Sequence, residues 1–331
     1  MEMTIISDKV YGEVEVNEEV LLELMDSAPL QRLKKIDQHG ARSFVFTNGS
    51  VSRYDHCVGV MLLLRKLGAS IEEQIAGLLH DVPHTAFSHV IDYVFEKNND
   101  EQEFHERFFE KVVMCSDVPE ILLKHGFDVK RVINEKLFNL LEKSGPDLCA
   151  DRLDYSFRDF IAFYGKDGRC ERFISHLIVH DNEIIFNDVS VGLEFAEHYL
   201  WMGREQWSHE LNVASYHYLA KALKRALGSH VINFEDLFST DDAVMKKLRS
   251  SKDPIISENL SYLVPTLKVE TCNEDEADIN SMAKLRYVDP KILLLDGFVK
   301  RVSESHPELL EMIEKHKLRT SEGVHLKVLS K

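Results

Sequence analysis

Apolar residues recur three and four positions apart through much of the chain, and this spacing places them on one face of an α-helix. Val20, Leu21 and Leu24 form such a face after a helix start predicted near Asn17. Similar apolar stripes follow as far as Gly228, separated by short β-branched runs. The pattern therefore predicts a mainly α-helical fold.

Two of the predicted helices begin with a recognisable cap. Ser52 stands three residues before Asp55, and Ser70 stands three residues before Glu73. In this arrangement the serine accepts a backbone hydrogen bond in the first turn of the helix. Pro83 disfavours helical geometry in the residue before it, so the second helix should end shortly before this proline.

Extended structure is expected in three places. Residues 174–179 and 184–188 flank a polar four-residue turn, which predicts a small β-hairpin. Residues 1–16 read as a short extended arm, and residues 324–329 as a strand near the end of the sequence. The strands are few and short, so they do not change the fold class.

The pattern becomes less regular after residue 230. Thr240 is a candidate cap for one helix, and Pro307 suits the first turn of another. We therefore predict a core domain, residues 1–230, followed by an accessory α+β region, residues 231–331. The composition of this accessory region suggests no chemistry.

The formal net charge of −16 argues against one class of function. Non-specific nucleic-acid binding needs a cationic face that displaces counterions, so we do not expect it. A local basic pocket is still compatible with the overall charge.

Cysteine use and hydropathy indicate an intracellular protein. The five cysteines show no paired spacing, which argues against a disulfide framework. The N-terminal residues lack the features of a signal peptide, and no apolar run approaches the roughly 18 residues of a membrane span. We expect a soluble protein in the cytoplasm, with a nuclear location left open and no membrane partner.

The candidate chemistry is concentrated in residues 52–92, with two further residues downstream. The candidates are His56, His80, Asp81, His84, His89, Asp92, His105 and Asp151. Imidazole and carboxylate groups suit borderline and hard divalent ions. Such an ion lowers the pKa of a coordinated water and polarises a phosphate ester, so the cluster predicts a metal-dependent phosphohydrolase.

The order of these residues resembles the HD-domain superfamily. The pattern starts in residues 53–56 (RYDH), continues through the adjacent His80 and Asp81, and ends in residues 151–155 (DRLDY). More narrowly, residues 29–40 (PLQRLKKIDQHG) and 79–89 (LHDVPHTAFSH) resemble the deoxynucleoside triphosphate triphosphohydrolases of that superfamily. This resemblance implies a helical HD core with a small β-hairpin and a C-terminal α+β appendage.

The resemblance also implies a role for individual residues. The implied metal ligands are His56, His80, Asp81 and Asp151. The implied catalytic residues are His84, His89, Asp92 and His105. The implied substrate-binding residues are Gln38, Arg53, Arg152, Tyr155, Asp159 and Arg204. His84 and His105 match histidines that lie near the substrate phosphates or a second metal.

Three features of the sequence bear on these assignments. Asp154 competes with Asp151 as the carboxylate ligand because it lies about one helical turn away. His39 replaces an apolar residue that the family often has, which bears on recognition of deoxyribose. Trp201 and Trp207 are expected in the core rather than in a base-stacking platform.

For activity, the resemblance implies hydrolysis of a deoxynucleoside triphosphate (dNTP) to the deoxynucleoside and tripolyphosphate. The reaction would use a divalent ion such as manganese, iron, zinc, nickel or magnesium, and a homo-oligomer is expected. A nucleotidase or a cyclic-nucleotide phosphodiesterase would use the same metal site. A non-catalytic nucleotide-binding regulatory module is a further hypothesis, although the complete ligand set argues against it. The last alternative is a subunit of an assembly, in which the C-terminal region carries the function.

Overall fold

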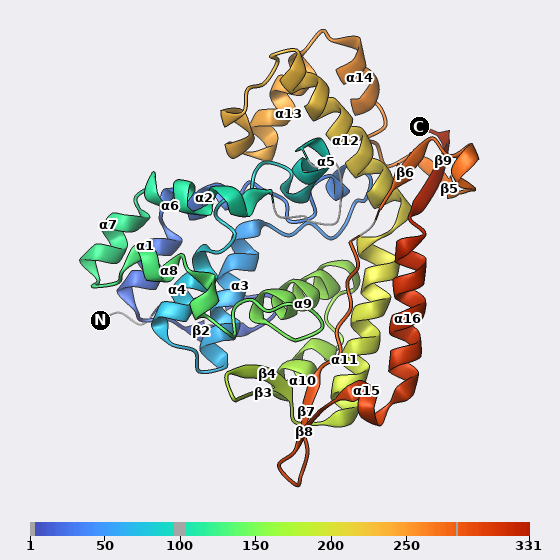
Figure 1. Cartoon of the computed structure of the whole chain (residues 1–331). Helices are drawn as coiled ribbons and strands as arrows, with labels where there is room; N and C mark the ends of the chain where they lie inside the picture. The colour runs from blue at the N-terminus through green and yellow to red at the C-terminus, as the bar shows by residue number, and fades with distance from the viewer. Residues whose placement is uncertain (1–3, 96–103, 283) are drawn as a thin grey trace.

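The computed structural model of the chain describes residues 4–95, 104–282 and 284–331 (Figure 1). Most of these residues are helical, which confirms the predicted fold class. The α-helices described are α1 (Glu19–Met25), α2 (Ala28–Leu33), α3 (Arg53–Lys66), α4 (Ile71–Leu79), α5 (Asp92–Phe95), α6 (Phe109–Met114), α7 (Val118–Lys124), α8 (Val129–Val132), α9 (Ala150–Tyr164), α10 (Arg169–Ser175), α11 (Val189–Met202), α12 (Glu210–Gly228), α13 (Asp241–Ser250), α14 (Pro254–Leu260), α15 (Val302–Ser305) and α16 (Pro307–Ser321).

Shorter helical turns join several of these helices. The 3-10 turns are η1 (Arg42–Phe44), η2 (Ser88–Ile91), η3 (His105–Phe108), η4 (Glu135–Leu137), η6 (Glu235–Phe238) and η7 (Glu274–Glu276). One π-helical turn, η5 (Gly203–Trp207), lies just after α11.

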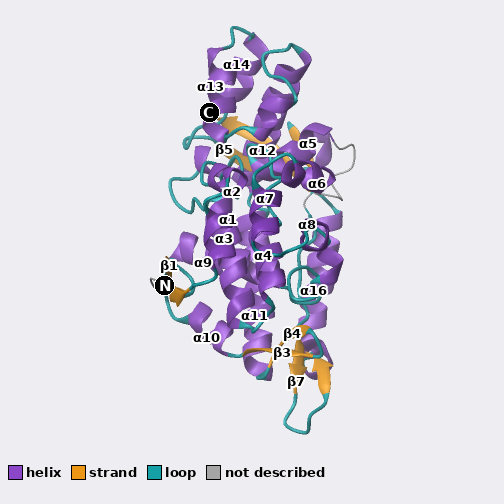
Figure 2. Ribbon diagram, turned by 90° about the vertical axis from the view of Figure 1, so that its left-hand side faces the viewer, coloured by secondary structure: helices purple, strands orange, loops and turns teal. Residues whose placement is uncertain are grey.

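The strands form three small sheets. They are β1 (Ile5–Asp8), β2 (Gly12–Glu15), β3 (Leu177–His180), β4 (Glu183–Phe186), β5 (Lys268–Thr271), β6 (Ile279–Ser281), β7 (Lys291–Leu293), β8 (Val299–Arg301) and β9 (Val324–Ser330). Strands β1 and β2 pair with each other, the second sheet has the order β3-β4-β7-β8, and the third has the order β5-β9-β6. Figure 2 shows the second sheet at the lower end of the molecule, with helices forming the middle.

Helix α3 lies at the centre of the core. It packs against α4 and α9, and the side chains of Val60, Leu62 and Leu64 are almost completely buried. A helix that is apolar on most of its surface is expected to be enclosed by its neighbours. Because α3 is held on several sides, the polar residues in its first turn have fixed positions.

Both predicted caps are confirmed. The Ser52 hydroxyl accepts a hydrogen bond from the Asp55 N–H at 3.0 Å, and the Ser70 hydroxyl accepts one from the Glu73 N–H at 3.1 Å. Helix α4 ends with His80 as its C-terminal cap, in the position that Pro83 predicted. These two helix ends therefore bring residues 53–56 and 80–81 to defined places.

The C-terminal third is joined to the rest of the chain through shared sheets and helices. Strand β7 pairs with β4, where Phe186 lies opposite Ile292, so the predicted hairpin of β3 and β4 becomes part of a larger sheet. Helix α16 packs along α11. The division at residue 230 remains a prediction, but residues 231–331 do not form a separate layer. Residues 5–15, expected as an extended arm, form the β1–β2 hairpin.

The helical pattern that was predicted to continue to Gly228 is interrupted. Helix α11 ends at Met202, the chain makes the η5 turn, and α12 begins at Glu210. Such π-helical turns often occur at functional sites. The sequence gave no clear signal for this break, since its residues are compatible with continued helix.

The segment after His84 also differs from the prediction of a helix through Phe95. Residues 84–87 are irregular, and the backbone becomes helical only in η2 and α5. Phe87 and Ser88 both have positive φ angles, of 62° and 49°, which no α-helix contains. The polar break predicted at residues 98–103 lies outside the described residues.

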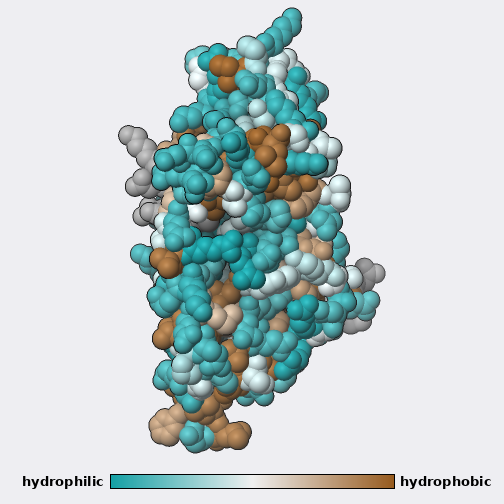
Figure 3. All heavy atoms as spheres, turned by 90° about the vertical axis from the view of Figure 1, so that its right-hand side faces the viewer, coloured by the Kyte–Doolittle hydropathy of each residue, from teal (hydrophilic) through white to brown (hydrophobic). Residues whose placement is uncertain are grey.

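Exposed hydrophobic side chains occur at several places on the described surface. One group in Figure 3 lies at the lower end, where the β7–β8 connection lies in Figure 1. Leu295 and Phe298 of this connection are exposed. None of the helices within the described ranges is both long enough and apolar enough to cross a membrane.

Candidate active site

The candidate residues meet at a cavity of about 690 Å³. One wall comes from α3, the end of α4 and the start of α9. Further lining residues come from residues 199–216 and 284–287. All but two of the residues proposed from the sequence for ligation, catalysis or substrate binding line it, and the exceptions are Asp92 and Arg204.

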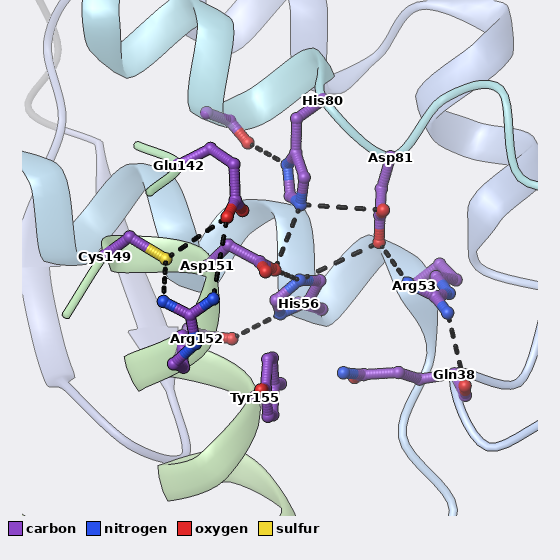
Figure 4. Close-up of polar contacts among 12 residues, drawn as sticks. Gln38, Arg53, His56, His80, Asp81, Glu142, Cys149, Asp151, Arg152 and Tyr155 are labelled. Carbon is purple, nitrogen blue, oxygen red and sulfur yellow. Dashed lines mark hydrogen bonds and ion pairs between the residues drawn. The ribbon is translucent and has the colours of Figure 1, made fainter. Parts of the chain in front are cut away.

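The four predicted metal ligands lie close together in the inner part of the cavity (Figure 4). Nε2 of His56 is 2.8 Å from Oδ1 of Asp151, and Nε2 of His80 is 3.5 Å from the same oxygen. Oxygens of Asp81 lie 3.6 Å from Nε2 of His80 and 3.8 Å from Nε2 of His56. Helices α3, α4 and α9 thus direct two imidazoles and two carboxylates to one point.

The other nitrogen of each imidazole has a fixed partner. Nδ1 of His80 is 2.8 Å from the carbonyl oxygen of Gly77, and Nδ1 of His56 is 2.8 Å from Oδ2 of Asp154. A carbonyl oxygen can only accept, so Nδ1 of His80 carries a proton and Nε2 is the nitrogen that is left to bind a cation. Of the two candidate carboxylates on α9, Asp151 faces the Nε2 atoms of the two histidines. Asp154 bonds to the opposite nitrogen of His56 and orients its ring.

The residues of this cluster fit a divalent ion. Nε2 of His80 is buried and has no hydrogen-bond partner in the described structure, although it points to the carboxylates. Burial alone would lower the pKa of His80, but Asp81 and Asp151 raise it to about 10. A site this attractive to positive charge, with two imidazoles and two carboxylates, matches the donor set of a transition-metal site.

A buried network connects the N-terminal hairpin to this cluster. The Tyr11 hydroxyl donates to Oδ1 of Asp154 at 2.9 Å, and Arg158 donates to both oxygens of Asp154 at 2.9 Å. Arg158 also donates to Oδ2 of Asp8 at 3.0 Å. Arg158 therefore lies behind His56 and does not line the cavity. The hairpin holds Asp154, which in turn holds His56.

Arg53 pairs with a metal ligand and does not extend into open space. Its Nη1 donates to Oδ2 of Asp81 at 2.6 Å, and its Nε donates to the Ser88 hydroxyl at 3.0 Å. Burial would raise the pKa of Asp81, but the charge of Arg53 and the neighbouring His84 and His80 hold it well below its usual value. Asp81 is therefore an anion in this setting, which suits its predicted role as a metal ligand.

Three histidines form a second cluster beside the first. The rings of His84 and His105 stack with centroids 3.6 Å apart, and the ring of His89 lies edge-on to His84 at 4.9 Å. Asp81, His84 and His105 have ligand atoms within 4.8 Å of one another, so this group can hold a second ion or a phosphate. The catalytic roles of the three histidines, implied by the resemblance, remain a prediction.

This histidine cluster is kept neutral by its surroundings. Burial, and then the charge of Arg53, lowers the pKa of His84 and of His89 well below the usual value. Burial, and then His89, lowers the pKa of His105 to about 3. Asp92 lies outside the cavity lining, but its Oδ2 is 3.1 Å from Nδ1 of His89 and orients that ring.

The turn that carries His89 is strained and firmly held. Phe87 and Ser88 occupy the left-handed region, which costs of the order of 1–3 kcal/mol for each such residue. The Phe87 N–H donates to Oδ1 of Asp241 at 2.7 Å, and the Ser88 hydroxyl donates to the Asp37 carbonyl at 2.6 Å. The conformation persists because its surroundings fix it, and it aims His89 at the cavity.

Three of the predicted substrate-binding residues, Gln38, Tyr155 and Arg152, line the cavity and differ in their hydrogen-bond partners. Gln38 and Tyr155 point toward the same space as the metal ligands in Figure 4. The Tyr155 hydroxyl bonds to that of Tyr199. Arg152 lines the wall, but its Nη1 donates to the carbonyls of Asp147 at 2.6 Å and Lys143 at 3.1 Å. Its guanidinium is therefore committed largely to backbone.

Asp159 acts on the wall of the cavity through its neighbours. Its Oδ1 is 2.8 Å from Nε2 of His39, and its Oδ2 accepts a hydrogen bond from Nε1 of Trp207 at 2.7 Å. Burial would lower the pKa of His39, but Asp159 and Asp37 raise it to about 9. His39, the departure noted in the sequence, is thus a cation held by two carboxylates.

Arg204 is not brought to the site. Its side chain is half exposed, its Nε donates to Glu205 at 2.6 Å, and it does not line the cavity. The cause is the η5 turn, which changes the helix phase after Met202 and directs Trp207 inward. Trp207 packs against Tyr155 and Tyr199 at ring distances of 5.4 and 4.9 Å, so it belongs to the cavity wall as well as to the core.

Several residues that line the cavity were not predicted from the sequence. The additional lining residues include Asn212, Tyr216, Lys284, Arg286 and Tyr287. Asn212 and Tyr216 would have been found only if the break between α11 and α12 had been recognised. Nothing in the local pattern of residues 284–287 indicated that this stretch returns to the site.

Comparison with known proteins identifies the family. The HD domain family matches residues 53–159. The chain is 40% identical over 327 residues to the uncharacterized protein YdhJ of Bacillus subtilis, covering 98% of this chain and 99% of that protein. It is 33% identical over 298 residues to the metal-dependent phosphohydrolase cns2 of Cordyceps militaris, covering 87% of this chain and 84% of that protein.

More distant matches agree with these. The chain is 24% identical over 291 residues to the deoxynucleoside triphosphate triphosphohydrolase SAMHD1 homolog of Dictyostelium discoideum, covering 76% of this chain and 55% of that protein. The crystal structure of a phosphohydrolase from Bacteroides thetaiotaomicron has a similar fold, with a TM-score of 0.66, 22% identity and coverage of 92% and 94% of the two chains. With its His/Asp cluster assembled in the cavity, the chain belongs to the HD-domain family of metal-dependent phosphohydrolases.

Proposed function

We propose that this phosphohydrolase acts on dNTPs and releases the deoxynucleoside and tripolyphosphate. The observation that carries the proposal is the meeting of four metal ligands, Arg53 and three uncharged histidines in one cavity of about 690 Å³. A cavity of this size suits a ligand as large as a nucleotide. The distant relationship to a dNTP triphosphohydrolase supports the choice of substrate.

The reaction needs a group that promotes attack on phosphorus. A divalent ion at His56, His80, Asp81 and Asp151 would polarise a phosphate oxygen and lower the pKa of a water. We propose manganese, iron, zinc, nickel or magnesium for this place, because His/Asp sites accept all of them. The residues of the chain then have to position the substrate, offset its charge and supply a proton.

We assign these tasks to the two clusters. Water attacks the α-phosphorus, the bond from phosphorus to the 5′ oxygen of the deoxynucleoside breaks, and the leaving oxygen takes a proton. His89, oriented by Asp92, is placed to give this proton, since the charge of a bound phosphate raises the pKa of a nearby imidazole. Arg53 lies beside Asp81 and opposes the negative charge of the phosphoryl oxygens.

A nucleotidase acting on monophosphates is the second candidate. The relative cns2 matches over most of its length and is named only as a metal-dependent phosphohydrolase. The same ligands and histidines would serve a single phosphate. The size of the cavity and its several cationic residues favour a larger, more highly charged substrate.

Product analysis separates these candidates. The purified protein is loaded with Mn²⁺ and incubated with dNTPs, NTPs and nucleoside monophosphates, and the products are resolved by ion-exchange chromatography. We expect deoxynucleoside and tripolyphosphate in equal amounts. Orthophosphate from monophosphates would replace the proposal with a nucleotidase, and absence of turnover with bound metal would favour a regulatory module. Size-exclusion chromatography tests the predicted homo-oligomer.

A further inference from the structure

The lining of the cavity includes a short segment from the C-terminal third of the chain. Lys284, Leu285, Arg286 and Tyr287 all line the cavity. They lie between β6 and β7, in the stretch that runs beside α9 and α11 in Figure 1. This segment brings two positive charges to a site whose other parts come mainly from residues 38–216.

The segment is fixed at several points. The Asp289 N–H donates to the Pro146 carbonyl at 3.1 Å, and Arg301 donates to the Asp289 carbonyl at 2.6 Å. Val288 is completely buried. The backbone carbonyl oxygen of Arg286 lies close to Gly203. A Cβ atom added at Gly203 would be 3.7 Å from this oxygen. Lys284 and Arg286 therefore occupy defined places in the wall.

The guanidinium of Arg286 lies beside the aromatic part of the cavity. Its central carbon is 5.9 Å from the centre of the Trp207 ring. Its positive charge also acts on the hydroxyls of Tyr155 and Tyr199, where it opposes the rise in pKa that burial causes. Arg286 thus lies at the part of the cavity lining formed by Tyr155, Tyr199 and Trp207.

The two cations also act on the proposed proton donor. Burial is the main reason for the low pKa of His89, and the charges of Arg53, Lys284 and Arg286 lower it further. Arg53 comes from α3, and the other two come from the C-terminal segment. Positive charge from two distant parts of the sequence therefore acts on His89.

The charge of the cavity differs from that of the whole chain. The described residues that line it include six acidic and six basic side chains, whereas the chain as a whole has 56 acidic and 40 basic residues. A divalent ion would make this lining positive in a protein that is otherwise strongly negative. Four of the six basic residues, Arg53, Lys136, Lys143 and Arg152, come from the first half of the chain. The other two, Lys284 and Arg286, come from the C-terminal segment.

We propose that Lys284 and Arg286 bind the phosphate groups of the substrate that lie beyond the one attacked. The site is then specific for a nucleotide that carries a chain of phosphates, and the C-terminal region is part of the recognition machinery. This inference rests on the proposed phosphohydrolysis of nucleotides and adds the residues that measure the length of the phosphate chain.

Binding of inorganic phosphates tests the proposal without any need for turnover. The full-length protein with a constant, saturating Mn²⁺ concentration is titrated calorimetrically with orthophosphate and with tripolyphosphate. We expect the double variant Lys284→Gln with Arg286→Gln to bind tripolyphosphate about ten- to a hundredfold more weakly, since each charge-assisted contact is worth about tenfold. Orthophosphate binding should change less than about threefold by the same reasoning.

Control variants separate this effect from general damage. Arg319→Gln on α16 removes an exposed positive charge that does not line the cavity and should leave both affinities unchanged. Arg286→Lys keeps the charge and should recover part of the tripolyphosphate affinity. Bound manganese, measured by mass spectrometry, should be the same in all variants. For any nucleotide that is hydrolysed, KM should rise much more than kcat falls.

Two outcomes would overturn the proposal. One is an unchanged preference for tripolyphosphate in the double variant, and the other is an equal loss of orthophosphate and tripolyphosphate binding. The proposed dNTP activity fails on a different result, namely no release of deoxynucleoside by the wild-type protein. Even then, this inference would be supported if the wild-type protein preferred tripolyphosphate to orthophosphate and the double variant did not.

Discussion

The two histidine clusters of the cavity show how one residue type acquires two chemical properties. In the metal cluster, His56 and His80 each have one ring nitrogen fixed by an acceptor, and the other nitrogen faces carboxylates. In the second cluster, His84 and His105 each have a buried Nδ1 without a hydrogen-bond partner in the described structure. The first arrangement prepares a lone pair for a cation.

The charged groups around the two clusters also differ. Carboxylates surround the first cluster and raise the pKa of His80, while burial and the cations around the second lower the pKa of His89. A positive ion is therefore favoured at the first cluster and an anionic phosphate at the second. The charged groups and burial around a histidine, and not the residue type, therefore decide whether it is suited to bind metal or to exchange a proton.

Removal of the metal cluster should have the largest effect. His80→Ala with Asp81→Asn deletes one ligand and the charge of another, so we expect loss of both bound metal and hydrolysis to background. Helicity, measured by circular dichroism, should remain. The matched control is His180→Ala with Asp181→Asn, an adjacent and exposed pair at the β3–β4 turn. Normal turnover by the metal-free variant would refute the assigned site.

Loss of one ring in the second cluster should reduce chemistry without loss of metal. For His89→Gln we expect kcat to fall by about 10²–10⁴-fold, the usual contribution of a general acid. Bound manganese should stay at the wild-type level, in contrast to the first variant. His217→Gln on α12, outside the cavity lining, serves as the control. If His89→Gln also lost its metal, the distinction between the clusters would not hold.

The hairpin network allows a finer test of the metal cluster. Tyr11→Phe removes the hydroxyl that donates to Asp154, so His56 should be held less firmly. Residues that support a metal ligand in this way typically contribute about ten- to a hundredfold to metal affinity. Chelator competition should show a weaker Kd for Mn²⁺, while Tyr54→Phe on α3 should have no effect. A lower Tm with unchanged affinity would indicate that the network is only structural.

The smallest effect is a dependence on pH that separates activity from stability. Burial raises the pKa of Asp92 from its usual value of 3.8 to about 6, against the charges of His105, Lys284 and Arg53. Below this pH the carboxyl is protonated and no longer orients His89, so kcat should fall as the pH decreases through about 6. Asp92→Asn should have a lower and flatter profile between pH 5 and pH 7.

Stability should change in the opposite direction over the same range. Because folding raises the pKa of Asp92, the folded chain binds this proton more tightly than the unfolded chain does. The contribution of Asp92 is therefore present at low pH and is lost as the pH rises through about 6. Denaturant unfolding of the wild type and of Asp92→Asn isolates this term. A parallel fall of kcat and stability toward acid would mean that another group controls both.

The parts of the site that local chemistry determines could be predicted from the sequence. Ser52, Ser70 and Pro83 set the ends of two helices, and those ends place His56, His80 and Asp81. His89 and Asp92 stand three positions apart, a spacing that lets two side chains meet on one helical face, and Nδ1 of His89 lies 3.1 Å from Oδ2 of Asp92. These relations involve residues a few positions apart, where helix geometry is the main constraint.

Relations across the chain could not be predicted in this way. The choice between Asp151 and Asp154 depends on which side of the His56 ring each carboxylate occupies, and only packing of α9 on α3 fixes it. The turn at η5, which removed Arg204 from the site and added Trp207, results from tertiary contacts with Tyr155 and Tyr199. The segment with Arg286 reaches the cavity only because β7 pairs with β4.

The late position of Lys284 and Arg286 also sets an order of events during synthesis. All four metal ligands precede residue 152, and about 135 residues separate Asp151 from Arg286. At roughly 5–20 residues per second, the ribosome needs about 7–27 s to make this part of the chain. A nascent chain therefore possesses its candidate metal ligands well before Lys284 and Arg286. On our proposal, it can hold an ion before it can bind a polyphosphate.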